Sequence, residues 1–290
     1  MINQFISKLS LADQIIFFTG KFFNKIASWI LSYKNFKLWQ SHYNILEYKN
    51  INAEFDGKEI HYRKDGLNAL ARKSGSDCLV FNLVIIEEEY KTALDIFLLN
   101  KIQLNSFLDL GGNIGLVSLY VNNIFPGCKI IAIEPDKNNY EMMVKNFELN
   151  HLANATPLMA GVSKKDCFLA ADGGLRDDKE WSFSFTETDD SAGIKAYSIN
   201  SLLAKYALEE IDFIKMDVEG AEQAIFDSDA DMSFLDKVKV LAIEIHDEFN
   251  TRDNIYKILK EKNFIVFNSN ETTIAVRGNL FEKFSNQKSK

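Results

Sequence analysis

The residues best suited to chemistry form a glycine-rich loop at positions 109–115, with the sequence DLGGNIG. The loop follows an apolar segment and precedes a helix-like one, and small residues in that setting let a ligand approach the backbone. Asp109, two residues ahead of the first glycine, would repel a pyrophosphate and attract an ammonium group. The loop therefore favours S-adenosylmethionine, which carries an ammonium and a sulfonium, over a dinucleotide. The expected cofactor contacts in the loop are Asp109, Gly111, Gly112, Asn113 and Gly115.

A second acidic residue, Glu134, ends the next apolar segment, KIIAIE. A carboxylate at the end of the second strand of an open α/β sheet can accept both hydroxyls of a ribose. The alternative interpretation, an acid that stabilises a helix N-terminus, fits Asp136 better than Glu134. We expect Glu134 and the adjacent Pro135 to bind the cofactor, and Ser163, after the third strand, to contact its adenine.

Four polar residues follow two later apolar segments. Asp217 and Glu219 come after IDFIKM, and Glu244 and His246 stand at the end of VKVLAIEI. Residues two apart point to the same side of an extended chain. Methylation of a hydroxyl requires removal of a proton, for which histidine is a natural general base. We expect His246 to be the base, Glu244 and Glu219 to assist it, and Asp217 to contact the cofactor. A divalent ion held by these four residues is the alternative, although no metal-motif spacing indicates it.

The segment 172–193 interrupts the regular pattern of the chain. It is polar and acidic around an aromatic centre that includes Trp181 and Phe183. Long excursions beside a ligand site often determine specificity, so we expect these two residues to contact the acceptor. An ordinary hairpin at the edge of the sheet is the structural alternative, and the two interpretations are compatible.

Strands and helices must hold these residues in place. Apolar runs at 106–110, 129–134, 211–217 and 238–245 predict strands, and each precedes a helix-like segment. This alternation predicts a Rossmann-like α/β fold with a mostly parallel sheet and right-handed crossovers. The segments NFIVFN and TTIAV predict an antiparallel C-terminal hairpin at the edge of that sheet.

In these segments the chain resembles the FkbM family of methyltransferases. FLDLGGNIG is similar to its first motif, AIEPDKNNYEMMVKNFELN to its ribose-binding acid and helix, and IDFIKMDVEGAE and LAIEIH to its two most distinctive blocks. The resemblance covers about residues 85–250 and implies methyl transfer from S-adenosylmethionine, usually to oxygen on small natural products or sugars. Gly112, where the family often has alanine, and Met216 are conservative departures.

The N-terminal third is organised differently. Residues 1–40 carry apolar residues at a spacing typical of one or two amphipathic helices. We interpret this extension as a cap on the domain or on a second subunit; contact with a membrane surface is the alternative. Residues 41–100 predict a small cap with strands between about 43 and 86, turns at Asp56-Gly57 and Asp65-Gly66, and a lead-in helix over 87–99. The methyltransferase domain then spans 101–280, and 281–290 predict a disordered tail.

Composition narrows the cellular setting and the partners. The net charge of −8 disfavours nucleic acid as a partner, because nucleic-acid binding needs clustered cations. Three widely spaced cysteines form neither a metal motif nor a disulfide framework, and we expect no signal peptide or membrane-spanning helix. We expect a cytoplasmic protein, peripheral to the inner face of a membrane if residues 1–40 bind one, that acts on a small-molecule or saccharide acceptor.

Two other functions are compatible with parts of this pattern. A nicotinamide-dependent oxidoreductase would use a similar sheet, but Asp109 and the glycine spacing argue against it. A binding or regulatory protein that kept the fold and lost catalysis is the second alternative. The complete DLGGNIG and DVEGAE segments argue against that interpretation.

Overall fold

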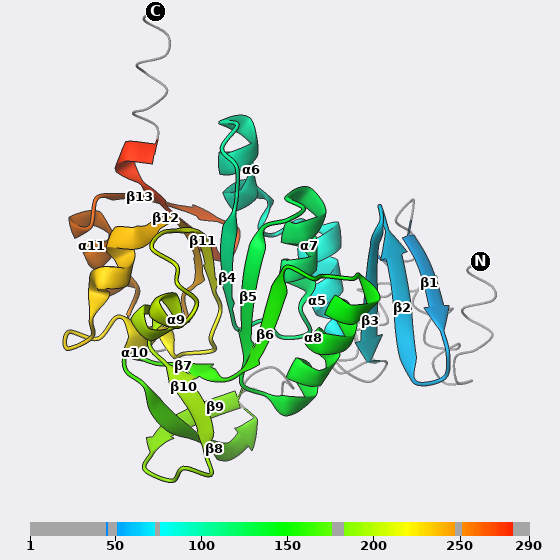
Figure 1. Ribbon diagram of the computed structural model, residues 1–290, viewed down its shortest axis with the longest axis horizontal. Helices are drawn as coiled ribbons and strands as arrows, with labels where there is room; N and C mark the ends of the chain where they lie inside the picture. The colour runs from blue at the N-terminus through cyan, green and yellow to red at the C-terminus, as the bar shows by residue number, and fades with distance from the viewer. Residues whose placement is uncertain (1–44, 46–50, 73–75, 176–182, 247–250, 281–290) are drawn as a thin grey trace, which may run out of the picture.

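The computed structural model describes residue 45 and residues 51–72, 76–175, 183–246 and 251–280 of the chain (Figure 1). The predictions for residues 1–40, for Trp181 and for the tail 281–290 lie outside these residues. Within the described part, no helix is long and apolar enough to cross a membrane.

A seven-stranded sheet with the order β13-β14-β12-β11-β4-β5-β6 forms the centre of the molecule. Its strands are β4 (Ser106–Leu110), β5 (Lys129–Glu134), β6 (Ala155–Met159), β11 (Ile211–Met216), β12 (Val238–Glu244), β13 (Phe264–Ser269) and β14 (Thr272–Arg277). The pairs among β4, β5, β6, β11 and β12 are parallel, whereas β14 is antiparallel to both β12 and β13. The predicted Rossmann-like α/β fold, with its antiparallel C-terminal hairpin, is confirmed.

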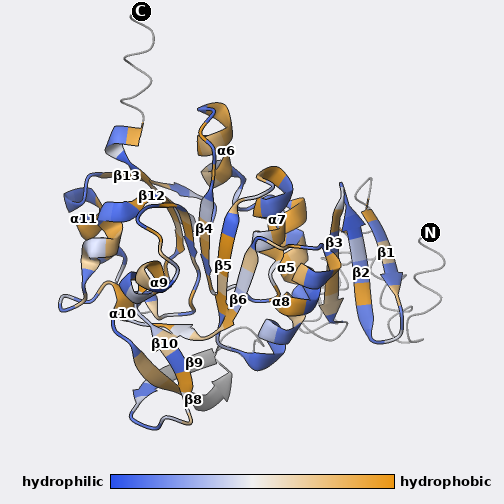
Figure 2. Cartoon of the chain, viewed as in Figure 1, coloured by the Kyte–Doolittle hydropathy of each residue, from blue (hydrophilic) through white to orange (hydrophobic). Residues whose placement is uncertain are grey.

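Helices cover both faces of this sheet (Figure 1). One face packs on α5 (Asp77–Phe81), the π-type turn η1 (Asn82–Ile86), α6 (Lys91–Leu99), α7 (Leu116–Ile124) and α8 (Lys137–Leu149). The other packs on α9 (Ile199–Lys205), α10 (Glu222–Ile225), η3 (Met232–Lys237) and α11 (Arg252–Glu261). Successive residues of β4 alternate between the two cores, Phe107 in one and Leu108 in the other. Because both faces are covered, the central strands consist mostly of hydrophobic residues (Figure 2).

A three-stranded antiparallel sheet precedes the main domain and shares its first core. It consists of β1 (Ile51–Phe55), β2 (Glu59–Lys64) and β3 (Leu67–Arg72). The turn between β2 and β3 has positive φ at both Asp65 and Gly66, as a tight hairpin turn requires. Asn146 of α8 accepts a hydrogen bond from the Leu70 amide and donates to the carbonyls of Leu70 and Ile114. This side chain joins the small sheet to the glycine-rich loop.

The structure differs from the sequence prediction at residues 77–86, which are helical in α5 and η1 rather than extended. Periodicity does not separate a short buried helix from a buried strand, and this apolar run has few turn residues inside it. The predicted lead-in helix over 87–99 begins at Lys91. Residues 79–90 of this region form one wall of the cleft at the end of the central strands.

A second, four-stranded sheet has the order β7-β10-β8-β9 and lies at the bottom of Figure 1. Its strands are β7 (Gly161–Val162), β8 (Cys167–Leu175), β9 (Phe183–Thr188) and β10 (Ile194–Tyr197). Of the segment 172–193, the structure describes the end of β8 and the residues from Phe183, the first residue of β9, and β8 and β9 pair antiparallel. A short turn, η5 (Gly278–Leu280), ends the described chain.

Candidate active site

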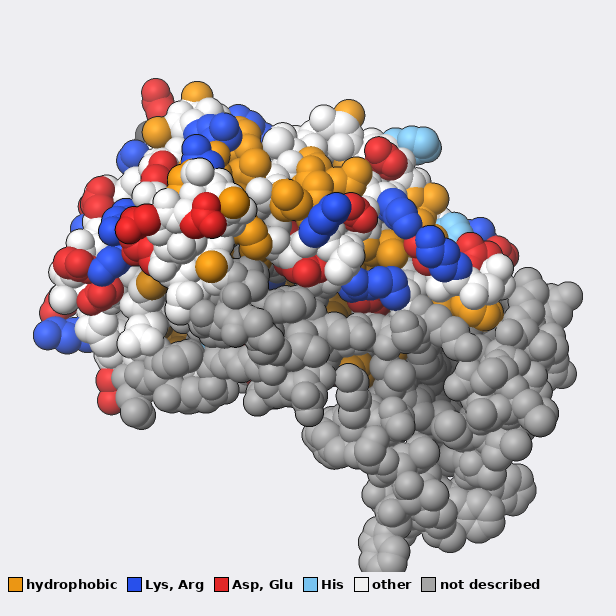
Figure 3. Space-filling model, turned by 90° about the horizontal axis from the view of Figure 1, so that it is seen from below, with side chains coloured by type: hydrophobic (Ala, Val, Ile, Leu, Met, Phe, Trp, Pro, Cys, Tyr) orange, Lys and Arg blue, Asp and Glu red, His pale blue; other side chains and the backbone are white. Residues whose placement is uncertain are grey.

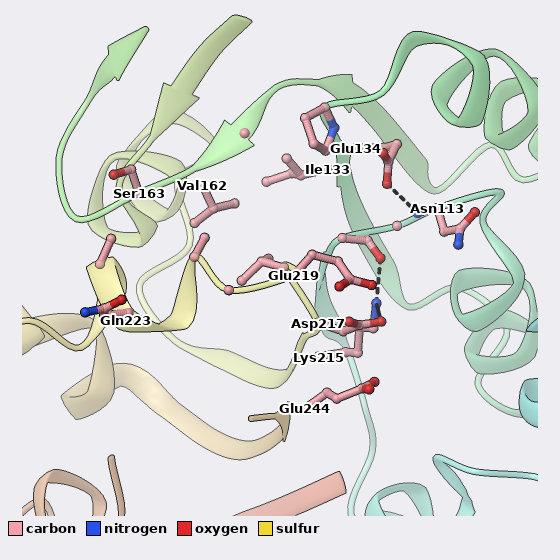
Figure 4. Close-up of a pocket in the computed structure, with 18 of the residues that line it drawn as sticks. Asn113, Ile133, Glu134, Val162, Ser163, Lys215, Asp217, Glu219, Gln223 and Glu244 are labelled. Carbon is pink, nitrogen blue, oxygen red and sulfur yellow. Dashed lines mark hydrogen bonds and ion pairs between the residues drawn. The ribbon is translucent and has the colours of Figure 1, made fainter. Parts of the chain in front are cut away.

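A cleft of about 910 Å³ opens where β4, β5, β11 and β12 end. The strand order changes direction between β4 and β11, and ligands of open α/β sheets bind at such a point. Figure 4 shows Glu134 on one side of this cleft and the carboxylates of Asp217, Glu219 and Glu244 on another. The cleft thus brings together residues that are far apart in the sequence.

The glycine-rich loop passes so close to the backbone of Asp217 that Gly111 has no room for a side chain. Gly111 has φ +78°, and an added Cβ would lie 1.7 Å from the carbonyl oxygen of Asp217. Gly112 and Asn113 continue along the cleft wall. Gly115 begins α7 with φ +86° and lies against Phe147, outside the set of residues that line the cleft. Gly111, Gly112 and Asn113 therefore line the cleft as predicted, and Gly115 lies behind them.

Glu134 is fixed by the backbone on both of its oxygens. Its Oε2 accepts a hydrogen bond of 2.7 Å from the Asn113 amide, and its Oε1 accepts one of 2.9 Å from the Asp136 amide. The side chain lines the cleft beside Pro135. Burial raises the pKa of Glu134 to about 7, although the two backbone donors oppose that shift. Each carboxylate oxygen has a second acceptor position, so the side chain can still receive ribose hydroxyls.

Asp109 does not line the cleft. It is fully buried, accepts a 2.6 Å hydrogen bond from the Ser118 hydroxyl, and lies 3.7 Å from the ammonium of Lys215. Burial raises the pKa of Asp109, while the positive charge of Lys215 opposes the rise. Asp109 therefore lies behind the loop, next to the buried charge of Lys215, and not in the cleft where the sequence prediction has it contact the cofactor.

Lys215 lines the cleft but was not singled out by the sequence interpretation. Its ammonium donates to the Gly111 carbonyl and lies 3.3 Å from Asp217 Oδ2. Burial alone would lower its pKa, but Asp217 and Asp109 outweigh burial and raise it, so Lys215 stays charged. The available signal was a lysine inside a mostly apolar strand, because a buried charge requires a partner.

The acidic side of the cleft holds Asp217, Glu219, Glu244 and Glu89. The charge of Asp217 and burial raise the pKa of Glu244 to about 8. Burial, with the charge of Asp217, also raises the pKa of Glu89, whose Oε1 accepts a hydrogen bond from Thr272. Glu89 was missed because it lies outside every recognisable motif. These carboxylates make this side of the cleft attractive to a cation or to hydroxyl donors.

His246 lies behind these acids and lines a smaller adjoining hollow rather than the main cleft. Its Nδ1 is 3.1 Å from Glu222 Oε1, and its Nε2 is 3.4 Å from Glu219 Oε2 and 4.0 Å from Glu244 Oε1. The hydrogen bond to Glu222 and the nearby acidic charges raise the pKa of His246 to about 9 although burial opposes the rise. The structure brings the predicted catalytic residues His246, Glu244 and Glu219 into one cluster.

The remaining predicted contacts lie elsewhere in the cleft or outside it. Ser163 lines the end farthest from the acids in Figure 4, near Val162 and Ile133. The apolar side chains of Val162 and Ile133 beside the Ser163 hydroxyl suit a flat heterocycle. Phe183 belongs to β9, and nothing in the described structure tests its predicted contact with an acceptor.

Comparison with known proteins supplies an independent result. Residues 109–266 match the model of the methyltransferase FkbM domain. The methyltransferase sdnD of Sordaria araneosa is 26% identical over 198 residues, covering 55% of this chain and 74% of that protein. Methyltransferase 1 of Beauveria bassiana is 24% identical over 187 residues, covering 56% of this chain and 73% of that protein. Among solved structures, the METTL16 methyltransferase domain gives a TM-score of 0.44 at 11% identity, covering 82% of this chain and 92% of that one.

Proposed function

The chain belongs to the FkbM methyltransferase family, and we propose that it transfers a methyl group from S-adenosylmethionine to a hydroxyl of a small-molecule or saccharide acceptor. Glu134 carries the cofactor part of this proposal, because it is a cleft-lining carboxylate that the backbone holds in place. The acidic cluster beyond it supports the acceptor part.

The cleft residues fit the cofactor. Glu134 would accept its ribose hydroxyls, and the wall at Val162 and Ser163 would contact its adenine. Gly111, which has no space for a Cβ, lets the backbone approach the amino-acid portion. Asp217 lines the cleft next to this loop and would attract the ammonium group. When bound, S-adenosylmethionine supplies an electrophilic methyl group on a positively charged sulfur.

The acceptor would lie against Glu219 and Glu244, which line the cleft. Bound S-adenosylmethionine would give its methyl group to the acceptor oxygen and leave as S-adenosylhomocysteine, so the residues of the chain have to align that oxygen and take its proton. The hydroxyl proton must leave, and we propose that Glu244, which lines the cleft and whose raised pKa makes its ionised form a strong base, receives it. Hydrogen bonds from the acceptor would align its oxygen for in-line attack.

For His246 we propose a less direct role than the general base predicted from the sequence. It lines the adjoining hollow, and Glu219 and Glu222 contact its two ring nitrogens. We therefore propose that His246 supports the neighbouring carboxylates and that Glu244 meets the acceptor. A change at His246 should then alter turnover through Glu219 and Glu244.

Nucleic acid is not the acceptor we propose. The net charge is −8, and on the face drawn in Figure 3 acidic and basic side chains intermingle among the described residues. Binding to a phosphate backbone depends on clustered Lys and Arg, which release counterions. A neutral, hydroxyl-rich acceptor suits the acidic wall of the cleft better.

A labelled-methyl assay tests the proposal. The full chain is incubated with radiolabelled S-adenosylmethionine and separate pools of sugars, lipid-linked glycans and small hydroxylated molecules. We expect label in one pool together with release of S-adenosylhomocysteine, and far slower labelling with Glu244→Gln. Calorimetry with S-adenosylmethionine and with NAD separates the two cofactor classes. Binding of NAD alone would overturn the methyltransferase proposal, and S-adenosylmethionine binding without transfer to any pool would favour a regulatory role.

A further inference from the structure

We propose that Asp217, Glu219 and His246 bind a divalent transition-metal ion beside the acceptor part of the cleft. The role of the ion in catalysis rests on the proposed function, whereas the choice of ligands rests on the distances between these side chains alone. One ligand atom from each of these residues lies within 4.8 Å of the other two. All three side chains are partly buried, with exposed fractions of 28%, 23% and 16% respectively.

The fold brings these ligands together from two neighbouring loops. β11 and β12 are adjacent parallel strands, so the residues after them meet at one edge of the sheet. Asp217 follows β11 directly, and His246 comes two residues after the end of β12. Between Asp217 and α10, Glu219 has φ +52°, a left-handed conformation that is uncommon outside glycine. This local backbone directs Glu219 toward His246.

The spacing already suits a small metal ion. His246 Nε2 lies 3.4 Å from Glu219 Oε2. Metal–nitrogen and metal–oxygen bonds of about 2.0–2.2 Å place neighbouring ligand atoms about 3.0–3.5 Å apart. A nitrogen ligand with two carboxylates favours Mn²⁺, Fe²⁺, Co²⁺ or Zn²⁺ over Ca²⁺, which prefers oxygen alone.

A residue outside the ligand set orients the histidine. Glu222 is only 1% exposed, and its Oε1 lies 3.1 Å from His246 Nδ1 while also accepting from the Val218 amide. With Nδ1–H donating to this carboxylate, Nε2 is the ring nitrogen that remains to bind an ion next to Glu219. Metal-binding histidines typically have such a carboxylate behind the ring, which fixes the tautomer. Glu222 is thus a positioning residue for the proposed site.

The charges around the site also favour a cation. Asp217, Glu219 and Glu244 gather on one wall of the cleft (Figure 4). Lys215 neutralises this group from its buried side, through Asp217. An ion on the opposite, open side would balance the remaining negative charge and place a positive charge near the acceptor hydroxyl. That charge would make the hydroxyl more acidic and help Glu244 remove its proton.

Direct Mn²⁺ binding tests this inference without any methyl transfer. The full chain is stripped with EDTA and titrated with Mn²⁺, and free Mn²⁺ is followed by electron paramagnetic resonance. We expect one saturable ion per chain. His246→Ala and Glu219→Gln should each weaken binding at least about tenfold, and Glu222→Ala by about 10–100-fold. Circular dichroism verifies that each variant is folded.

Glu271→Gln is the matched control, because Glu271 is an exposed acid that borders the same hollow as His246 without belonging to the ligand set. Its Mn²⁺ affinity should match that of the wild type. The proposal is overturned if the wild-type chain binds no stoichiometric Mn²⁺, or if Glu271→Gln weakens binding as much as His246→Ala does. Methyl transfer by the metal-stripped chain would support the proposed function and exclude a catalytic role for the ion. Mn²⁺ binding without any methyl transfer would support the metal site and contradict the proposed function.

Discussion

Lys215 on β11 is the direct register partner of Asp109 on β4, and its ammonium lies 3.7 Å from the Asp109 carboxylate. Both side chains are almost completely buried, with exposed fractions of 3% and 0%. The acid ahead of the glycine-rich loop is therefore neutralised from within the sheet. Its charge holds Lys215 in place, and Lys215 in turn holds the Gly111 carbonyl.

Replacement of Lys215 by methionine should destabilise the fold strongly. It would leave Asp109 buried without its cation, which costs about 3–5 kcal/mol of unfolding free energy. Urea denaturation followed by circular dichroism measures this change. The double variant Asp109→Asn, Lys215→Met should be more stable than Lys215→Met alone. A single variant within about 1 kcal/mol of the wild type would contradict the buried-pair interpretation.

Glu134→Ala should weaken S-adenosylmethionine binding while the chain remains folded. Loss of a hydrogen bond to a charged group typically costs about 1.5–3 kcal/mol, or a rise in Kd of roughly tenfold or more. Isothermal calorimetry gives the affinity, and thermal unfolding verifies the fold. Wild-type affinity in a folded variant would show that the ribose lies elsewhere.

Cofactor affinity should also depend on pH through Glu134. Its pKa is raised to about 7 in the free protein, and ribose hydroxyls donate only to its ionised form. Below that pH the free protein gains a proton that binding must displace, so Kd should rise roughly tenfold between about pH 8 and pH 6. Glu134→Gln, which does not titrate, should lack this part of the dependence. An equal slope in both proteins would assign it to other groups.

Gly111→Ala should abolish cofactor binding. The new Cβ would lie 1.7 Å from the Asp217 carbonyl oxygen, so the loop or the segment after β11 must move. Gly127→Ala is a matched control, because Gly127 has φ +89° and no atom within 4 Å of an added Cβ. That control should lose only about 1–2 kcal/mol for its left-handed backbone and bind the cofactor normally. Equal effects of the two substitutions would mean that backbone strain, not the close approach, is responsible.

Glu244→Gln should reduce turnover by about 10²–10⁴-fold, because the variant retains the shape of the side chain but lacks the proton acceptor. S-adenosylmethionine affinity should remain unchanged, since Glu244 would meet the acceptor. Single-turnover transfer and calorimetry on the same sample separate the two effects. Normal turnover would assign proton removal to another group.

Much of the fold was predictable from the sequence because central parallel strands are buried on both faces. The apolar runs that begin at Ser106, Lys129, Ile211 and Val238 correspond to β4, β5, β11 and β12. Residues 77–86 were not predictable in the same way, since helix and strand both bury a short apolar run. In the structure these residues are helical, and they pack in the core that the main sheet shares with the three-stranded sheet.

The candidate site was predictable where local sequence determines local backbone. Gly111 and Glu134 have recognisable neighbours, and both line the cleft. Lys215 and Glu89 depend instead on partners that only the folded sheet brings close. The position of Asp109 behind the loop could not be predicted for the same reason, because its partners in the folded chain are Ser118 and Lys215. Pairings of this kind leave no spacing pattern in the sequence.

The contact between the glycine-rich loop and the segment after β11 also has a consequence for folding. The hydrogen bond from Lys215 to the Gly111 carbonyl joins residues 104 positions apart. Long-range strand pairing of this kind forms slowly, because the entropy of closing a large loop is lost before any stabilising contact has formed. Two halves of the cofactor site therefore remain separate until the middle of the sheet has assembled. In refolding experiments, recovery of cofactor binding should lag behind the formation of helices.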